Sequence, residues 1–352
     1  MKYSSGLGEA FRNSWAETIF KQKYRHEGAW TWEELSRTLV EDVCRDYLSR
    51  EDKSELTNYI STMKFIPGGR YCYYAGRAKK YFNNCYLLRC EEDSREDWAN
   101  LSWKAERCLT VGGGIGSDYS IYRRRGSVLH STGGMASGPV SKMRMVNEIG
   151  REVIQGGSRR SAIYASLNWQ HEDINEFLHA KDWYNLKIAG TDKTYGQVRE
   201  LDYNFPCPLD MTNISLNYDT DWLMDYWKTG EVGATFMANC LQAMSTGEPG
   251  FSFNFFDQEN ETLRNACTEV TSSDDSDVCN LGSINLSRIE SISELRDVVD
   301  LATKFLICGT LVATMPYEKV EQVREKNRRL GLGLMGVHEW LIQRGYKYEV
   351  TS

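Results

Sequence analysis

The sequence predicts an α/β fold in which a helical N-terminal region, residues 1–80, precedes alternating strands and helices over residues 81–352. Two patterns indicate this fold. Residues 33–48 and 52–63 have the apolar spacing of amphipathic helices, and from Cys85 onward short apolar runs alternate with helical patterns. Such alternation is typical of a sheet whose strands are largely parallel and buried between helices.

The N-terminal helices are followed by a segment that is expected to be rich in loops. Acidic residues occupy the first turn of helix 33–48, where they complement the helix dipole, and one face carries Leu35, Leu39, Val43 and Tyr47. The sequence FIPGGRYCYYAGR, residues 65–77, then interrupts the helical pattern with a proline and three glycines.

The alternating region is assigned from its apolar periodicity. Pro139 suits the first turn of a helix, because it lacks the N–H that a helix start leaves unpaired. Residues 204–217 are expected to be extended, with a break at Pro206 and Pro208. Strands are expected at 85–90, 117–127, 161–167, 251–256 and 279–286, and helices at 95–111, 139–155, 171–180, 232–245, 292–313, 318–327 and 334–344.

Composition excludes several classes of protein. The chain has 352 residues, of which 41% are hydrophobic and 26% charged, which is a globular rather than a disordered composition. A net charge of −7 argues against nucleic-acid binding as the main activity. The sequence contains neither an apolar run of about 18 residues nor the core of a signal peptide. We therefore expect a cytoplasmic protein that binds neither nucleic acid nor membrane.

The ten cysteines do not suggest a disulfide scaffold or a zinc site. They are too sparse for a disulfide-stabilised fold, and a cytoplasmic chain would keep them reduced. No CxxC occurs, and the five histidines lie far from any pair of cysteines, so no metal site is expected. Most of these thiols are therefore expected to be small core residues.

Two glycine-rich segments invite hypotheses about nucleotide binding. GGGIG, residues 112–116, follows a predicted helix and precedes a predicted strand, which is the reverse of the dinucleotide-binding order. We interpret it as a helix C-terminus and tight turn. TGGMASGP, residues 132–139, precedes a helix and could offer backbone N–H groups to an anion, but a plain loop fits equally well.

The sharpest chemical signal is NACTE, residues 265–269, followed by CNLGSINL, residues 279–286. In an extended segment Asn265, Cys267 and Glu269 would point to one face, where an amide, a thiol and a carboxylate could hold a hydroxyl and move a proton. The polar residues 271–277 are expected to be flexible enough to bring Cys279 near Cys267. A strand with one buried cysteine also fits these residues, so both interpretations stay open.

Several segments together resemble one family, the large catalytic subunit of ribonucleotide reductases. The resemblance implies a ten-stranded α/β barrel built from two parallel five-stranded halves, with a finger loop that carries a cysteine into the centre. Residues 81–352 would form the first part of this barrel. The matching segments occur in family order from residue 65 to about residue 341: FIPGGRYCYYAGR, FNNCYLL, GGGIGSDYS, TGGMASGP, QGGSRRSA, NACTE, CNLGSINL and KNRRLGLGLMGVHEWL.

The resemblance implies roles for individual residues in the reduction of ribonucleotides to 2′-deoxyribonucleotides. Cys267 matches the cysteine that becomes a thiyl radical, and Glu269 matches the base that takes the 3′-hydroxyl proton. Cys85 and Cys279 match the pair that reduces the 2′ carbon and ends as a disulfide. Asn265 matches the amide that holds the ribose hydroxyls, and Asn84 is expected at the substrate.

The resemblance also implies control by a nucleotide effector, a dNTP or ATP. Asp93 aligns with an effector-binding carboxylate. The loop that couples the effector site to base selection matches Gln155, Gly156, Gly157, Ser158, Arg159, Arg160 and Ser161. Alternatively, Arg159 and Arg160 are two solvated arginines at the start of a strand and have no role in binding.

The family has several classes, which differ in the source of the radical, and the matching segments resemble one class more than the others. GGGIGSDYS, the RRSA form of the loop, KNRRLGLGLMGVHEWL and TWEEL near the N-terminus are more similar to class II enzymes, which use adenosylcobalamin. A class I α subunit, which receives its radical from a separate metal-containing subunit, is the alternative. The residues before Cys85 are too few for the ATP-binding cone of many members.

Several segments of the family pattern have no counterpart in this sequence. The later barrel strands, the loop for substrate phosphate and the C-terminal cysteine pair are not matched. We therefore expect the chain to be inactive alone and to need a C-terminal half of the same enzyme. The other expected partners are a ribonucleoside di- or triphosphate, a thioredoxin- or glutaredoxin-like reductant and a second copy in a homodimer. A non-catalytic nucleotide-binding fragment is the remaining hypothesis.

Overall fold

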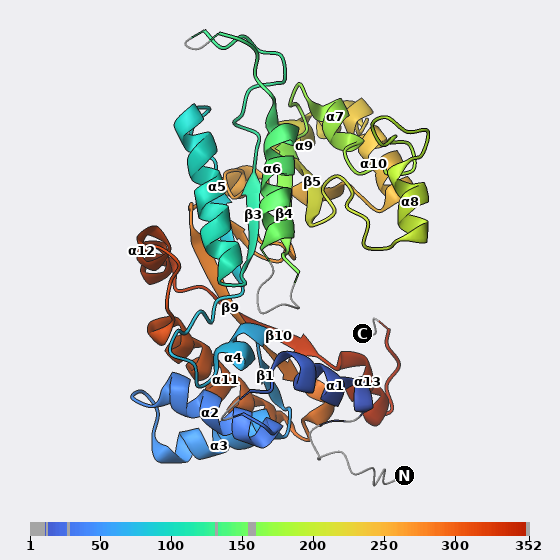
Figure 1. Cartoon of the computed structure of the whole chain (residues 1–352). Helices are drawn as coiled ribbons and strands as arrows, with labels where there is room; N and C mark the ends of the chain where they lie inside the picture. Colours follow the sequence, from blue (N-terminus) through green and yellow to red (C-terminus); the bar gives the residue numbers. More distant parts are fainter. Residues whose placement is uncertain (1–10, 12, 27–28, 131–132, 154–159, 350–352) are drawn as a thin grey trace. The chain divides into compact units, whose positions relative to one another are not determined.

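The structure, a computed structural model, describes residues 11, 13–26, 29–130, 133–153 and 160–349 (Figure 1). The chain divides into two compact units. Residues 1–84 and 278–352 form unit 1, and residues 85–277 form unit 2. The α/β class predicted from the sequence is confirmed, because strands and helices alternate through unit 2. The division at residue 80 remains a prediction.

Unit 2 contains a parallel sheet whose strands follow one another in chain order. They are β2 (Cys85–Arg89), β3 (Gly114–Asp118), β4 (Ile163–Asn168), β5 (Thr212–Tyr218) and β6 (Gly250–Phe253). Each neighbouring pair is parallel, with Cys85 opposite Gly114 and Ser215 opposite Gly250. The first four strands are almost completely buried, as expected when helices cover a parallel sheet.

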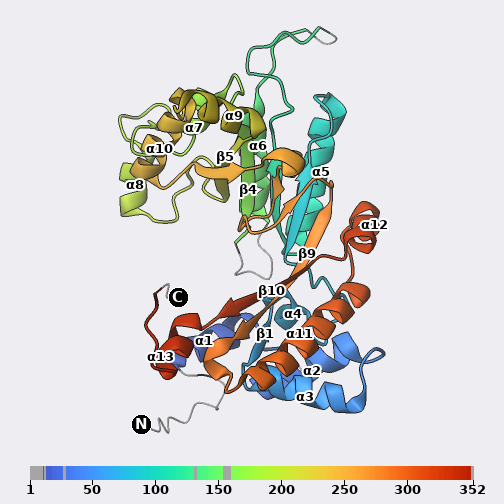
Figure 2. The same cartoon turned by 180° about the vertical axis from the view of Figure 1, so that it is seen from behind.

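The helices of unit 2 connect successive strands. α5 (Arg95–Thr110) begins at the N-cap Ser94 and joins β2 to β3, and α6 (Pro139–Glu152) joins β3 to β4 with Pro139 in its first turn, as predicted. Figure 2 shows further helices gathered beside β5. They are α7 (Ile174–Leu178), α8 (Tyr195–Leu201), α9 (Thr220–Thr229) and α10 (Ala234–Thr246).

The later part of unit 2 forms a short ribbon. A 3-10 helix, Phe256–Gln258, follows β6. The strands β7 (Leu263–Arg264) and β8 (Thr271–Ser272) then pair in antiparallel fashion, with Arg264 opposite Thr271. The turn between them carries the NACTE residues, so this ribbon positions the candidate site.

Within its described residues, unit 1 combines helices with three strands. β9 (Asp277–Asn285), which begins at the boundary of the units, pairs with β1 (Phe65–Pro67) in antiparallel and with β10 (Leu330–Met335) in parallel fashion. The 3-10 helix Leu286–Arg288 follows β9. The helices are α1 (Ser14–Lys23), α2 (Trp32–Cys44), α3 (Arg50–Ser61), α4 (Gly69–Tyr74), α11 (Ile292–Val312), α12 (Glu318–Asn327) and α13 (Val337–Gln343).

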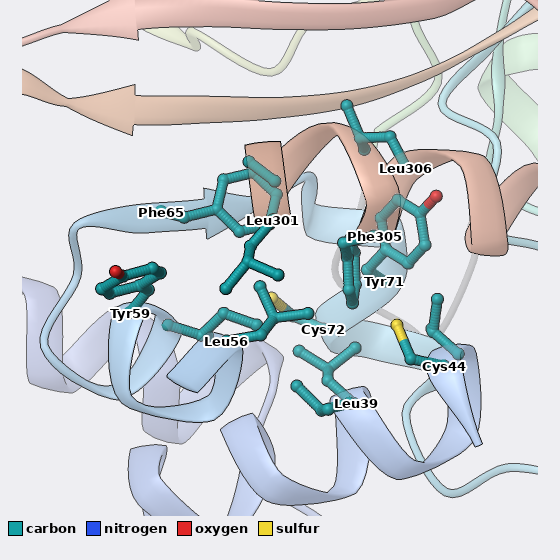
Figure 3. Close-up of a cluster of buried hydrophobic side chains, with 14 of the residues drawn as sticks. Leu39, Cys44, Leu56, Tyr59, Phe65, Tyr71, Cys72, Leu301, Phe305 and Leu306 are labelled. Atoms are coloured by element: carbon teal, nitrogen blue, oxygen red, sulfur yellow. The ribbon is translucent and has the colours of Figure 1, made fainter. Parts of the chain in front are cut away.

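The core of unit 1 lies between its N-terminal helices and α11 (Figure 3). Leu39 and Leu56 are fully buried against Phe305 of α11 in one hydrophobic cluster. The ring of Tyr71 lies 5.0 Å from that of Phe305. Burial of these apolar side chains is the main stabilising term for the unit.

Several local predictions are wrong. Residues 65–77 contain β1 and α4 rather than a loop, and residues 119–127 form turns after β3 instead of a strand. Residues 204–211 also form turns, so only the end of 204–217 is a strand. The helix predicted at 334–344 is preceded by strand β10, which glycines at alternate positions had concealed. Tyr47 lies beyond the end of α2 and is exposed.

Candidate functional site

Residues 265–269 form a turn rather than the extended segment that was predicted. The N–H of Thr268 donates to the carbonyl of Asn265 at 3.0 Å, and Thr268 has a left-handed backbone, with φ of 69°. The turn separates the three side chains. Asn265 is fully buried, whereas Cys267 and Glu269 are exposed at the tip.

Asn265 connects the turn to strand β2. Its Nδ2 donates to the sulfur of Cys85 at 3.4 Å, and its Oδ1 accepts from the N–H of Val270 at 3.1 Å. Because Asn265 is completely buried and Cys85 is 4% exposed, these bonds are shielded from solvent. Two residues predicted from the sequence, Asn265 and Cys85, are therefore in direct contact.

The glycines of β3 allow the turn to approach the sheet. A Cβ on Gly116 would lie 1.8 Å from the carbonyl oxygen of Arg264, and one on Gly114 would lie 3.1 Å from the Cβ of Ala266. Only a residue without a side chain permits the first of these approaches. The GGGIG segment therefore ends α5, as predicted, and also provides the surface on which the turn lies.

Side chains of neighbouring strands hold the base of the turn. Arg264 donates from Nε to the hydroxyl of Ser252 at 2.7 Å and from Nη2 to Oδ1 of Asn254 at 2.9 Å. The Nδ2 of Asn213 donates to the carbonyl of Ala266 at 3.1 Å. The turn that presents Cys267 is thus fixed at both sides by buried or half-buried polar contacts.

The segment 271–277 is anchored, which contradicts its predicted flexibility. Ser272, Asp275, Ser276 and Asp277 are all buried. Asp275 forms an ion pair with Lys104 of α5 at 2.9 Å and accepts the N–H of Arg89 at 2.7 Å. Alternating serine and aspartate looked solvated in the sequence, but here each buried carboxylate has nearby donors.

Two predicted site residues lie in unit 1. Cys279 is buried on β9, and its carbonyl accepts the N–H of Asn84 at 3.1 Å. The Oδ1 of Asn84 is buried without a hydrogen-bond partner among the described residues. The pairing of Cys279 with Cys85 remains a prediction.

The predicted specificity loop is only partly described. Gln155, Gly156, Gly157, Ser158 and Arg159 lie outside the described residues. At the end of the loop, the hydroxyl of Ser161 donates to the carbonyl of Val153 at 3.2 Å. Arg160 is exposed and donates from Nη2 to Oδ1 of Asn204 at 2.5 Å.

The cysteines without a predicted role are mainly core residues. Cys44, Cys72, Cys90, Cys108, Cys207 and Cys308 are buried, and Cys240 is half-buried. Burial raises the pKa of the Cys72 thiol to about 12, which keeps it protonated at neutral pH. Cys267 differs from all of these in its exposure.

A second feature of unit 2 is a cavity of about 720 Å³ at the start of α5. Its wall includes Asp93, Ser94, Arg123 and, from the segment before α6, Met135 and Gly138. The Nε of Arg123 lies 2.5 Å from Oδ2 of Asp93. The cavity therefore contains the residue that was aligned with an effector-binding carboxylate.

Sequence reasoning missed the residues that hold the turn. Arg264, Asn213 and Lys104 have no motif of their own, and their roles depend on strands far apart in the sequence. The GGGIG segment was the one available signal, because glycines inside a strand can mark a close approach of another backbone. Within the described ranges, no cluster of side chains is suited to a metal ion, and no helix is long and apolar enough to cross a membrane.

Comparisons with known proteins place the chain in a family. The family described as "Ribonucleotide reductase, barrel domain" matches residues 83–193 and 220–352. A vitamin B12-dependent ribonucleoside-diphosphate reductase of Thermoplasma acidophilum is 29% identical, over 81% of this chain and 38% of its own length. One from Mycobacterium tuberculosis is 28% identical, over 95% of this chain and 51% of its own length.

More distant relatives have other names. The ribonucleoside-diphosphate reductase large chain of Cryptosporidium parvum is 25% identical, over 78% of this chain and 39% of its own length. The chain therefore spans about 38–51% of the length of these curated relatives.

Proposed function

The chain belongs to the ribonucleotide reductase family, and we propose that it supplies the radical and thiol residues that convert ribonucleotides to 2′-deoxyribonucleotides. The observation that carries this proposal is the contact between Asn265 and Cys85 beneath the exposed Cys267. The thiol of Cys267 lies at the tip of an anchored turn, and the thiol of Cys85 accepts a hydrogen bond from the amide of Asn265 at the base of that turn.

The proposed chemistry assigns one step to each residue. Cys267, as a thiyl radical, takes the 3′ hydrogen, and Glu269 takes the 3′-hydroxyl proton. Cys85 and Cys279 together supply two protons and two electrons and end as a disulfide: one proton leaves with the 2′-hydroxyl as water, and the other proton and the two electrons go to the 2′ carbon. Glu269 then returns its proton to the 3′ oxygen, and Cys267 returns a hydrogen to the 3′ carbon and regains the radical. Asn265 and Asn84 would hold the ribose hydroxyls.

The proposed radical source is adenosylcobalamin, because two relatives carry vitamin B12-dependent names. When bound, this cofactor supplies a radical by breaking its cobalt–carbon bond. The exposure of Cys267 fits such a source, because the thiol can be reached from outside unit 2. A class I arrangement, with a separate metal-containing subunit, is the alternative.

We further propose that activity requires the remaining half of the barrel. β6 pairs only with β5 among the described strands, and its Phe251 and Phe253 are 38% and 45% exposed. α10 has no charged residue in its sequence, and its exposed residues Met237, Leu241 and Met244 recur at helical spacing. An uncharged edge and helix face of this kind suit burial against another part of the same domain.

The cavity beside Asp93 is the proposed site for a nucleotide effector. It offers the carboxylate of Asp93 for a ribose hydroxyl and, for phosphate, the remaining donors of Arg123, whose Nε pairs with that carboxylate, next to the N-terminus of α5. This cavity also favours the second candidate function, a nucleotide-binding chain without catalysis. Binding of a dNTP that is lost in Asp93→Asn, without turnover under any condition, would support that candidate.

The test is a reconstituted assay. The 352-residue chain is combined with a polypeptide carrying the second half of the barrel, a dithiol reductant and ribonucleoside di- or triphosphates, with and without adenosylcobalamin. We expect deoxyribonucleotide only with the cofactor, and none with Cys267→Ser. Cys240→Ser, at a half-buried cysteine without a proposed role, is the matched control.

Three outcomes separate the alternatives. Turnover that survives Cys267→Ser would overturn the proposed chemistry. Turnover that needs a metal-containing subunit instead of the cofactor would identify a class I enzyme. A thioredoxin- or glutaredoxin-like protein that sustains many turnovers would identify the reductant, and sedimentation of the complex would show whether it is a homodimer.

A further inference from the structure

A second cavity of unit 2 contains an unusual set of arginines. It has a volume of about 350 Å³, which is at the lower end for small-molecule sites. Its polar wall consists of Arg151, Arg160, Arg199, Tyr203, Asn204 and Asp210. It shares none of its lining residues with the cavity beside Asp93, and none of them belongs to the 265–269 turn.

Much of this cavity lies outside the part of the chain that matches the family. The match stops at residue 193 and resumes at residue 220. Arg199, Tyr203, Asn204 and Asp210 all lie in the gap, on α8 and the turns before β5. Part of the cavity wall is therefore formed by a segment that the family model does not match, whereas Arg151 and Arg160 belong to the matched part.

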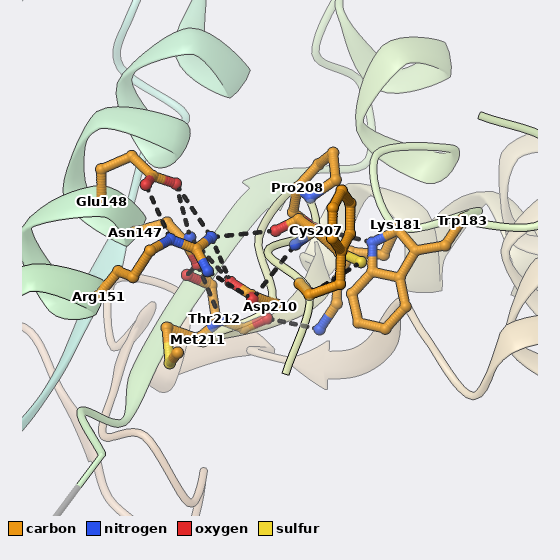
Figure 4. A network of polar contacts seen from close by, with 11 residues as sticks. Asn147, Glu148, Arg151, Lys181, Trp183, Cys207, Pro208, Asp210, Met211 and Thr212 are labelled. Atoms are coloured by element: carbon orange, nitrogen blue, oxygen red, sulfur yellow. Dashed lines mark hydrogen bonds and ion pairs between the residues drawn. The ribbon is translucent and has the colours of Figure 1, made fainter. Parts of the chain in front are cut away.

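The positive charge of Arg151 is balanced by carboxylates of the same unit (Figure 4). Its Nη1 and Nη2 each lie 2.8 Å from an oxygen of Asp210, and its Nε lies 2.9 Å from Glu148. This two-point contact neutralises Asp210, the one carboxylate that the described residues contribute to the cavity wall. Of the described side chains, Arg160 and Arg199 supply the charge that remains in the wall.

Neither Arg160 nor Arg199 forms an ion pair within the described ranges. The guanidinium of Arg199 lies 4.4 Å from the ring of Trp183 and 5.3 Å from that of Tyr203, which fixes its position. Trp183 is itself held, because its Nε1 donates to the carbonyl of Pro208 at 2.9 Å. A side chain that is already held in one position loses little conformational entropy when it binds a ligand.

One N–H group of Arg199 makes no hydrogen bond to the described residues. Its Nη1 is buried and has no hydrogen-bond partner among the described residues. A buried N–H without an acceptor is destabilising, so such a group needs an explanation. The two aromatic rings account for the position of the guanidinium plane but provide no acceptor for this atom.

We propose that this cavity binds a phosphoryl group, with its oxygens accepting hydrogen bonds from Arg160 and Arg199. Guanidinium groups match phosphate oxygens in geometry and charge, and two of them without carboxylate partners face the same cavity. Nη1 of Arg199 is buried, so the guanidinium would have to turn toward the cavity for the phosphoryl group to become its acceptor. Inorganic phosphates and nucleotides share this chemistry, and the test distinguishes them.

The test measures binding of inorganic pyrophosphate and of ATP to the 352-residue chain by isothermal titration calorimetry. We expect both Arg160→Gln and Arg199→Gln to weaken binding about tenfold or more, as for other hydrogen bonds to charged groups. Arg124→Gln is the matched control, because Arg124 is exposed on the same unit and pairs with Glu172. Equal affinities for the two ligands would identify a phosphate site, and tighter binding of ATP a nucleotide site.

Other results would overturn the proposal. They are no binding by the native chain, equal weakening by Arg124→Gln, or weakening by Arg123→Gln alone, which would place the ligand beside Asp93. Arg160 is exposed and makes one neutral hydrogen bond, so Arg160→Gln keeps the test valid even if Arg199→Gln disturbs packing against Trp183. Failure of this proposal and failure of the proposed reduction chemistry are distinguishable, because the reduction chemistry is tested separately at Cys267, whereas Arg160 belongs to the loop 155–161 that was predicted to couple effector and substrate.

Discussion

Asn265 donates a hydrogen bond to the sulfur of Cys85 across 180 residues of sequence, and the same amide accepts the N–H of Val270. One buried side chain therefore fixes both a thiol on β2 and the turn that presents Cys267. The geometry of the site depends on this amide, which has a donor and an acceptor on one planar group.

Asn265→Ala is expected to destabilise unit 2 by about 1–3 kcal/mol, because it leaves the N–H of Val270 without its acceptor. Asn265→Asp retains an acceptor but places a carboxylate against the Cys85 sulfur, so it should restore only part of the stability. The free energy of unfolding of both variants is measured by urea denaturation. Asn185→Ala, at an exposed asparagine that donates to Asp182, is the control and should cost less. Equal stability of all three variants and the native chain would show that the contact is not formed.

Gly116→Ala tests the close approach of the turn to β3. The added methyl group would meet the carbonyl of Arg264 at 1.8 Å, so a backbone must move, and we expect a loss of about 3 kcal/mol. Alkylation of Cys267, followed by peptide mass spectrometry, should change in rate because the turn is displaced. Gly190→Ala adds a methyl group in open space and should cost only about 1 kcal/mol through its left-handed backbone. If the two variants behave alike, Gly116 does not support the turn.

The sequence predicted the long periodic elements well. α12 has the predicted bounds, and α11 differs by one residue, because a sustained apolar stripe determines a helix locally. α4 and β10 were missed because glycines mark breaks in a sequence but are tolerated in elements whose stability comes from packing.

The candidate site was predicted in its residues but not in its geometry. NACTE named Asn265, Cys267 and Glu269, yet their separation depends on a left-handed Thr268, a conformation that threonine rarely adopts. The turn is held in this conformation by contacts to β3, β5 and β6, which are distant in sequence. Local propensity contains no information about such contacts.

The buried ion pair of Lys104 and Asp275 provides a third test. Both side chains are at most 4% exposed, and their charged atoms lie 2.9 Å apart. Lys104→Met leaves a buried carboxylate without its cation, so we expect a loss of about 3–5 kcal/mol in urea unfolding. The double variant Lys104→Met/Asp275→Asn should recover part of this loss. Arg124→Met, which breaks an exposed pair, should change stability by less than about 1 kcal/mol. A double variant no more stable than the single one would contradict this account.

Lys142 makes the stability of unit 2 dependent on pH. The side chain is fully buried on α6, where its Nζ donates to the carbonyl of Trp98 and the hydroxyl of Ser102. Burial lowers the pKa of Lys142 from 10.5 to about 8, although Cys90 and Asp97 act in the opposite direction.

The sign of the pH effect follows from which state holds the proton. Below pH 8 both states are protonated, and the folded state bears the full cost of a buried ammonium. Between about pH 8 and 10.5 the unfolded chain binds more protons, so the contribution of Lys142 to stability rises with pH. The shift corresponds to about 3 kcal/mol in total.

The measurement is the difference in unfolding free energy between Lys142→Met and the native chain, from pH 7 to 10.5. A difference is needed because burial raises the pKa of Cys72 and of Tyr218 to about 12, and these groups lower stability at alkaline pH in both proteins. We expect Lys142→Met to be the more stable protein at pH 7 and its advantage to shrink above pH 8. Lys187→Met, at an exposed lysine, should give a flat difference. A flat difference for Lys142→Met as well would mean that Lys142 keeps its proton in the folded state throughout this range.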